Sequence, residues 1–223
     1  VAGHYGIKVD HAKTLAGSGI QKNVVALGIV VAHAQGQIAF LFCIQKNRIK
    51  LKDKTFRVLI SAEEIDKAVT RVAEQLNERY EGRTPIFLGV LNGSFLFLAD
   101  LVRKVNFENQ VAFVKISSYV GTESTGRVTQ QLGIDFDIEG RDIVIVEDIV
   151  ETGHSMTYLL DYLKSKNPAS ISICTLFFKP EKFLYDYDID YTALSIGNEF
   201  IVGYGLDYDQ LGRNLKDIYV IDE

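Results

Sequence analysis

The sequence predicts an α/β protein in which a central parallel sheet is flanked by helices. From Phe56 onward, apolar runs of strand length alternate with segments whose apolar residues recur at helical spacing, and this alternation is typical of parallel sheets. The runs at 85–91 and 143–146 are almost continuously apolar, which indicates strands buried on both faces. In such sheets ligands bind at the carboxyl ends of the strands, so we expect the functional residues in the loops that follow the strands.

The first helix carries the clearest local signals. Ser61 and Glu64 have the spacing of a capping box, and the apolar residues behind them recur at helical intervals: Ile65, Ala68, Val69, Val72, Ala73 and Leu76. The same reasoning along the chain predicts, in order, a strand at 85–91, a turn at 92–94, a helix at 95–104, a strand at 111–116, a polar loop or hairpin at 117–131, a strand at 142–147, a helix at 155–164, a strand at 170–178 and two short strands near 191–196 and 200–203.

The charge distribution divides the chain. Residues 1–57 hold nine Lys/Arg and two Asp/Glu, whereas residues 58–223 hold fifteen Lys/Arg and twenty-seven Asp/Glu. A shift of this kind marks a boundary. We interpret residues 1–53 as an N-terminal extension outside the main domain, which spans residues 54–223.

Composition argues against several classes of partner. The formal net charge of -5 does not favour nucleic acid or an anionic membrane surface. The apolar runs at 24–32 and 38–44 are far shorter than the ~20 residues of a membrane span. Cys43 and Cys174 each lie in an apolar stretch, which favours buried, reduced thiols and a reducing cytoplasm. We therefore expect a cytoplasmic protein without a nucleic-acid or membrane partner.

An acidic pair follows the apolar run at 143–146. Glu147 and Asp148 repel each other unless a cation or hydroxyl donors lie between them. The residues from Glu151 to Ser155 then supply hydroxyls, a glycine and successive backbone N–H groups where the next helix is predicted to begin. Such a loop can cradle a phosphate group, although the GxxxxGK[ST] pattern of the P-loop is absent from the sequence.

The string VIVEDIVETGHS, residues 144–155, resembles the phosphoribosyl-pyrophosphate signature of type I phosphoribosyltransferases. The resemblance implies that family's fold, a central parallel sheet with a small hood and a mobile lid loop, and a phosphoribosyltransferase domain at residues 54–223. It implies that Glu147 and Asp148 hold the ribose hydroxyls and the magnesium shell. It also implies that the loop holds the 5′-phosphate through the residues that follow Glu151, namely Thr152, Gly153, His154 and Ser155.

Further segments in the family's order extend the resemblance from Phe56 to the C-terminus. They imply a pyrophosphate loop with a strained peptide bond at Leu91, Asn92 and Gly93, a mobile lid opening at Ser118 and Tyr119, a purine-reading Lys179 and a pyrophosphate-binding Arg213. The segment 200–208 resembles that of the hypoxanthine-guanine enzymes in particular. It implies base stacking by Phe200, reading of the base edge by the main chain of Ile201, and a metal-binding Asp207.

The implied reaction transfers a phosphoribosyl group from phosphoribosyl pyrophosphate to a 6-oxopurine with Mg²⁺ as cofactor, in the manner of purine salvage and IMP biosynthesis. Three residues depart from the commonest pattern of the family. Glu151 stands where the family's general base is usually Asp, which moves the carboxylate by ~1 Å and leaves its catalytic role open. His154 and Asn92 each stand where a lysine is frequent, so two fixed positive charges are missing.

Two alternatives remain open from the sequence. A regulatory RNA-binding protein on the same fold would favour a basic face, whereas residues 58–223 are acidic on balance. A phosphoribosyltransferase for another base, such as xanthine, uracil, adenine or orotate, is the second alternative. The segments at Lys179 and at 200–207 favour a 6-oxopurine but do not separate hypoxanthine, guanine and xanthine. The family resemblance also implies a homodimer or homotetramer.

Overall fold

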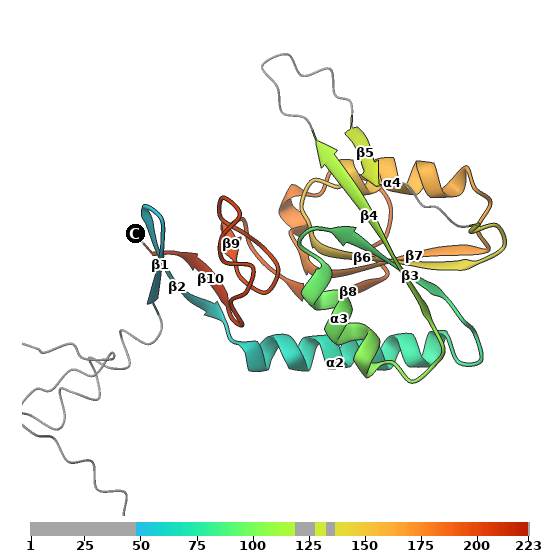
Figure 1. The fold of residues 1–223 in the computed structure, drawn as a ribbon, viewed down its shortest axis with the longest axis horizontal. Helices are drawn as coiled ribbons and strands as arrows, with labels where there is room; N and C mark the ends of the chain where they lie inside the picture. Colours follow the sequence, from blue (N-terminus) through green and yellow to red (C-terminus); the bar gives the residue numbers. More distant parts are fainter. Residues whose placement is uncertain (1–47, 119–127, 133–136, 223) are drawn as a thin grey trace, which may run out of the picture. The chain divides into compact units, whose positions relative to one another are not determined.

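The computed structural model describes residues 48–118, 128–132 and 137–222 (Figure 1). The larger of two sheets has the strand order β5-β4-β3-β6-β7-β8. Neighbouring strands from β4 to β8 in this order are parallel, and only β5 runs antiparallel, against β4. The strands are β3 (Ile86–Leu91), β4 (Gln110–Ser118), β5 (Val128–Leu132), β6 (Asp142–Val150), β7 (Ser170–Phe178) and β8 (Tyr191–Ser195). The predicted parallel sheet is confirmed.

Helices cover both faces of this sheet. Helices α2 (Ala62–Arg79) and α3 (Phe95–Lys104) pack on one face, and α4 (His154–Lys164) packs on the other. The predicted capping box of α2 is formed, with Ser61 accepting from the backbone N–H of Glu64 and the Glu64 carboxylate accepting from the N–H of Ser61. All six apolar residues that define the predicted face of α2 are buried.

Strand β6 shows why the strands are apolar throughout. Val144 and Val146 pack in the core beneath α2 and α3, whereas Ile143 and Ile145 pack in the core beneath α4. Because successive side chains of a strand point to opposite faces, a strand covered on both faces needs an apolar residue at every position.

A second, antiparallel sheet has the order β1-β2-β10-β9. Its strands are β1 (Arg48–Leu51), β2 (Lys54–Ile60), β9 (Ile201–Val202) and β10 (Ile218–Ile221). A short 3₁₀ helix, η1 (Pro180–Lys182), lies in the chain between β7 and β8 of the larger sheet. Phe56, Val202 and Tyr219 form its small core. This sheet corresponds to the predicted hood.

Several predicted element boundaries differ from the structure: β3 begins at Ile86 rather than at 85, and β4 spans Gln110–Ser118 rather than 111–116. The strand expected to end at Glu147 continues to Val150, because Ile149 and Val150 pair with Phe177 and Phe178 of β7. Glu147 and Asp148 therefore lie within β6 rather than at its end. Helix α4 begins at His154, one residue earlier than expected.

Two other sequence inferences concern partners and cysteines. In the described ranges, no helix combines the length and the apolar character needed to cross a membrane. Cys174 is a buried free thiol, and burial raises the pKa of that thiol above its ordinary value. Cys43 lies outside the described residues.

The role of residues 1–53 stays a prediction, and the structure suggests where to test it. Strand β1 pairs with β2, and the partly buried Ile49 and Leu51 pack on the hood core. A chain shortened to begin at Arg48 should keep its melting temperature. A chain shortened to begin at Lys54 should melt about 4–8 °C lower, because burial of two partly covered apolar side chains contributes ~2 kcal/mol. Equal melting of the two shortened chains in scanning calorimetry would contradict this expectation.

Candidate active site

The carboxyl ends of β3, β6 and β7 bring three predicted segments to one edge of the sheet. These strands are parallel neighbours, so the turn after Leu91, the acidic end of β6 and Lys179 after β7 share that edge. The backbone N–H of Lys179 donates to the carbonyl of Val150 at 3.0 Å. This bond continues the ladder one step beyond β7 and places Lys179 beside Glu151.

Gly93 and Asp148 occupy adjoining space. A Cβ built at Gly93 would lie 1.4 Å from Oδ2 of Asp148, so only glycine leaves room for that carboxylate. The predicted turn is formed by 92–94, and the Leu91–Asn92 peptide bond, which the resemblance marks as unusual, is cis. Asn92 is exposed and Gly93 is buried.

The segment after β9 joins this loop through Gly205. A Cβ at Gly205 would lie 2.0 Å from the carbonyl oxygen of Gly93, and the φ of Gly205 is +103°, a value that side-chain-bearing residues rarely adopt. Arg213 donates through Nη1 to the carbonyl of Gly205 at 2.8 Å and forms a 2.6 Å ion pair through Nη2 with Oδ1 of Asp207. Arg213 and Asp207 are therefore brought to the side of the Gly93 loop.

The acidic pair is held in an environment that disfavours its charge. Burial first, and the charge of Asp148 second, raise the pKa of Glu147 well above its ordinary value. Burial also raises the pKa of Asp148, partly opposed by hydrogen bonds and by the charge of Arg213. Two partly buried carboxylates whose ionisation is suppressed are suited to a hard divalent cation, which favours their ionised forms.

The acidic pair fits an Mg²⁺ ion that the protein shares with the substrate. Within residues 48–118, 128–132 and 137–222, no three acidic, His or Cys side chains form a cation cage, and Asp207 is paired with Arg213. Mg²⁺ typically binds one or two carboxylates, several waters and substrate phosphate oxygens. Glu147 and Asp148 fit that role, whereas Asp207 would have to exchange its arginine partner for the ion.

The loop after β6 lines an open cavity of about 290 Å³ at the start of α4. It is lined by the whole predicted phosphate loop together with its neighbours: Glu147, Ile149, Val150, Glu151, Thr152, Gly153, His154, Ser155 and Met156. Gly153, the residue before α4, has a φ of +87°. The first backbone N–H groups of a helix have no partner within the helix, so they can bind an anion here.

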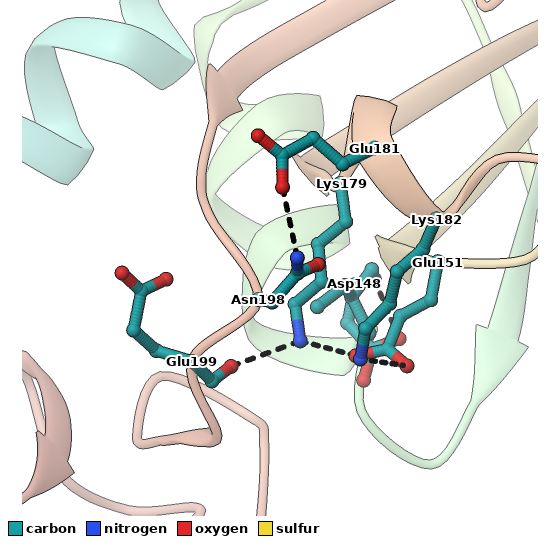
Figure 2. Close-up of polar contacts among 8 residues, drawn as sticks. Asp148, Glu151, Lys179, Glu181, Lys182, Asn198 and Glu199 are labelled. Atoms are coloured by element: carbon teal, nitrogen blue, oxygen red, sulfur yellow. Dashed lines mark hydrogen bonds and ion pairs between the residues drawn. The ribbon is translucent and has the colours of Figure 1, made fainter.

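Glu151 and Lys179 form the polar centre of the site (Figure 2). Lys179 is only 3% exposed. Its Nζ contacts Oε1 of Glu151 in an ion pair and donates to the carbonyl of Glu199 at 2.9 Å. Lys182, on η1, brings a second ammonium group to 3.7 Å from Oε2 of Glu151. A buried lysine needs such partners because an unpaired charge is costly to bury.

The remaining predicted residues flank this centre. Phe200 is 47% exposed, and its ring meets Tyr208 edge to face at a centroid distance of 5.9 Å. Ile201 is buried in β9. Ser118 is the last residue of β4, and Tyr119 lies outside the described residues.

Sequence reasoning missed three contributors. Lys182 and the carbonyl of Glu199 contact the Glu151–Lys179 pair, but neither stands in a pattern that signals this contact. Tyr185 contacts His154. Its signal was the spacing of Phe183, Tyr185 and Tyr187 at alternate positions, which indicates aromatic side chains on one side of an extended segment.

Comparison with known proteins identifies the family. The model of the phosphoribosyl transferase domain matches residues 61–209. A hypoxanthine-guanine phosphoribosyltransferase of Streptococcus pneumoniae strain R6 is 40% identical over 174 residues, which cover 78% of this chain and 97% of the relative. The chain belongs to the phosphoribosyltransferase family.

Solved structures place it among the type I enzymes. A hypoxanthine-guanine phosphoribosyltransferase of Bacillus anthracis superposes with a TM-score of 0.70 at 36% identity, covering 74% of this chain and 96% of that one. A hypoxanthine phosphoribosyltransferase of Staphylococcus aureus gives a TM-score of 0.71 at 34% identity, covering 81% and 95%. The fold predicted from the sequence is confirmed.

The raised pKa of Glu147 predicts a pH-dependent stability. A carboxyl group whose pKa is higher in the folded state than the ~4.3 of the unfolded chain destabilises the fold as the pH rises through the folded-state value. Glu147→Gln removes that charge, so the ligand-free variant should melt at least ~2 °C above the unmodified protein at pH 8, with a smaller gap at pH 5. Glu139→Gln, at an exposed position, is the matched control. An equal or lower melting temperature of Glu147→Gln at pH 8 would contradict the assignment.

Proposed function

We propose that this chain transfers the 5-phosphoribosyl group from phosphoribosyl pyrophosphate to hypoxanthine, and also to guanine, giving IMP or GMP and pyrophosphate in purine salvage. The observation that carries the proposal is the buried Lys179 beside Glu151 at the carboxyl edge of the sheet, next to the phosphate loop. The family, and the names of the relatives with high coverage, support the same activity.

The sugar substrate would be held at both of its phosphate groups. The 5′-phosphate fits the cavity of residues 151–155, where the start of α4 offers backbone N–H groups. The pyrophosphate fits the Gly93 loop, where Arg213 lies close by and can exchange Asp207 for a phosphate oxygen. Glu147 and Asp148 would accept hydrogen bonds from the ribose hydroxyls. When bound there, Mg²⁺ supplies positive charge to the departing pyrophosphate.

The purine would enter between Phe200 and Lys179. The exposed face of Phe200 can stack on the base, and the main chain of Ile201 can read its edge. An ammonium group has three N–H donors, and the contacts of Lys179 with Glu151 and Glu199 use two of them. The third can donate to the 6-oxo oxygen of hypoxanthine or guanine.

In the reaction, the bond from ribose C1′ to the pyrophosphate oxygen breaks and the bond from C1′ to purine N9 forms. The purine must lose one proton, and the carboxylate of Glu151 would take it from the base at N7. The transition state resembles an oxocarbenium ion, which nearby carboxylates favour. Closure of the segment that begins at Ser118 and Tyr119 would exclude water from the sugar cation.

The direct test is pyrophosphate release with five bases: hypoxanthine, guanine, xanthine, adenine and uracil. We expect release with hypoxanthine and guanine, complete loss in excess chelator, and recovery when Mg²⁺ is added, because the acidic pair and a diphosphate need a hard cation between them. Turnover that persists in chelator would contradict the metal assignment. No turnover with any base would leave the regulatory RNA-binding alternative.

Glu151 is the residue whose catalytic role is tested most sharply. Glu151→Gln keeps the size of the side chain and removes its capacity to accept a proton, so kcat should fall ~10²–10⁴-fold while the Kd of phosphoribosyl pyrophosphate changes little. Glu181→Gln is the control, since Glu181 lies on η1 and bonds Asn198 at 2.9 Å (Figure 2). Near-normal turnover of Glu151→Gln would remove this residue from the catalytic machinery.

Glu151→Asp tests whether the site is built around the longer side chain. The present carboxylate reaches both Lys179 and Lys182, and a shorter one withdraws by ~1 Å, a displacement that is enough to reduce turnover strongly. We therefore expect a lower kcat although the commoner residue of the family is restored. A kcat equal to or above that of the unmodified protein would show that the site merely tolerates Glu.

We also propose a homodimer or homotetramer in the cytoplasm, with residues 1–53 as an N-terminal extension of the catalytic domain whose strand β1 adds to the edge of the hood sheet. Exposed apolar side chains on α3 and β4, at Phe95, Val111 and Phe113, support an oligomer interface. The buried free thiol of Cys174 fits a reducing compartment. Sedimentation velocity measures the oligomeric state, and a monomer at micromolar concentration would contradict the proposed oligomer. Cell fractionation tests the proposed location.

A further inference from the structure

An aromatic bracket, formed by Phe183, Tyr185 and Tyr187, packs against the phosphate loop. A Cβ at Gly153 would lie 2.7 Å from the ring of Phe183, 2.9 Å from the ring of Tyr185 and 3.0 Å from the hydroxyl of Tyr187. The Tyr187 hydroxyl donates to the carbonyl of Gly153 at 3.1 Å. The loop is therefore covered on one side by side chains that come from beyond η1.

The bracket engages one nitrogen of His154. Nδ1 of His154 lies 2.6 Å from the hydroxyl of Tyr185, and the two rings meet edge to face at 88° with centroids 5.5 Å apart. His154 also lines the cavity of the phosphate loop. Since Nδ1 is turned toward Tyr185, Nε2 is the nitrogen that remains for a ligand in the cavity.

The contact between Tyr185 and Nδ1 determines whether Nε2 of His154 donates or accepts a hydrogen bond. In neutral imidazole one ring nitrogen carries a proton and the other accepts. When the Tyr185 hydroxyl donates to Nδ1, the proton resides on Nε2; when the imidazolium forms, Nε2–H is present as well. The oxygens of a phosphate dianion only accept hydrogen bonds, so a bound dianion selects the forms of His154 that carry a proton on Nε2. Nε2 is then a donor whether or not the ring is charged.

We propose that Tyr185 is a positioning residue for the 5′-phosphate: it fixes the ring and the tautomer of His154 so that Nε2–H donates to the phosphate. This inference rests on the proposed function, which assigns the 5′-phosphate to this loop. It accounts for the histidine in place of the lysine that is frequent in the family. The Nε2–H donor of His154, held in one direction by Tyr185, replaces the positive charge of a flexible lysine.

The experiment isolates the phosphate by comparing IMP with inosine, which differ only in that group. Calorimetry gives both Kd values for the unmodified protein, Tyr185→Phe, His154→Ala and the double variant; the measured quantity is the ratio of the Kd of inosine to that of IMP. Tyr185→Phe should lower this ratio about fivefold, the effect of one hydrogen bond, and leave the Kd of inosine within about twofold. In the His154→Ala background, Tyr185→Phe should change the ratio by less than about 1.5-fold.

Tyr162→Phe is the matched control, since Tyr162 lies on α4 about two turns beyond His154. An equal loss of IMP and inosine affinity in Tyr185→Phe would overturn the proposal, because Tyr185 would then act on the whole site. The proposal would also be overturned if Tyr185→Phe left the ratio of the two Kd values unchanged, or if it lowered the ratio equally in proteins with His154 and with His154→Ala. The turnover of the unmodified protein is measured alongside. If the protein turns over but the effects of the Tyr185 and His154 substitutions are additive, only the role of Tyr185 is overturned. If the protein shows neither turnover nor IMP binding, the proposed function is overturned and this proposal with it.

Discussion

The active site depends on the register in which β6 pairs with its two neighbours. Val150 is the partner of Phe178, so the next residues of the two strands, Glu151 and Lys179, emerge side by side. On the other side, Gly89 is the partner of Val146, which brings Gly93 against Asp148. A shift of one residue in either pairing would turn every side chain of the shifted strand to the opposite face, and the apolar residues of both cores oppose such a shift. Packing therefore sets the distances on which the chemistry relies.

Close contacts at two glycines fix the position of the segment after β9 relative to the main sheet. Asp148 fills the space beside Gly93, and the carbonyl of Gly93 fills the space beside Gly205. The second contact places Arg213 and Asp207, which are bound to each other and to Gly205 through Arg213. Three chain segments thus meet through contacts that any added Cβ would break, and each of them brings one part of the substrate-binding surface.

The parts of the fold that local sequence determines were predicted closely. The capping box and the apolar face of α2, and the bounds of α3 and β7, follow from neighbouring residues alone. The end of β6 was predicted wrongly because acidic residues usually end a buried strand, whereas pairing with β7 carries this strand on to Val150. The side-chain alternation also changes phase between Val146 and Ile149, since both pack in the core beneath α2 and α3.

For the site, the motif predicted which residues to examine but not their partners. The contacts of Glu151 with Lys179 and of His154 with Tyr185 each span about thirty residues, and no local pattern encodes such a separation. Asp207 illustrates the same limit, because its ion pair with Arg213 depends on how the chain turns between them.

The position of β10 has a consequence for synthesis on the ribosome. β10 lies between β2 and β9 in the hood sheet, and Val220 pairs with Ile201, the residue next to Phe200. A nascent chain that has completed β8 already contains the strands, the loop and the helix of the phosphate site, whereas β10, the strand that pairs with the purine segment, is translated later. Because domains assemble as their segments emerge, the nascent protein should acquire its 5′-phosphate site before its base site.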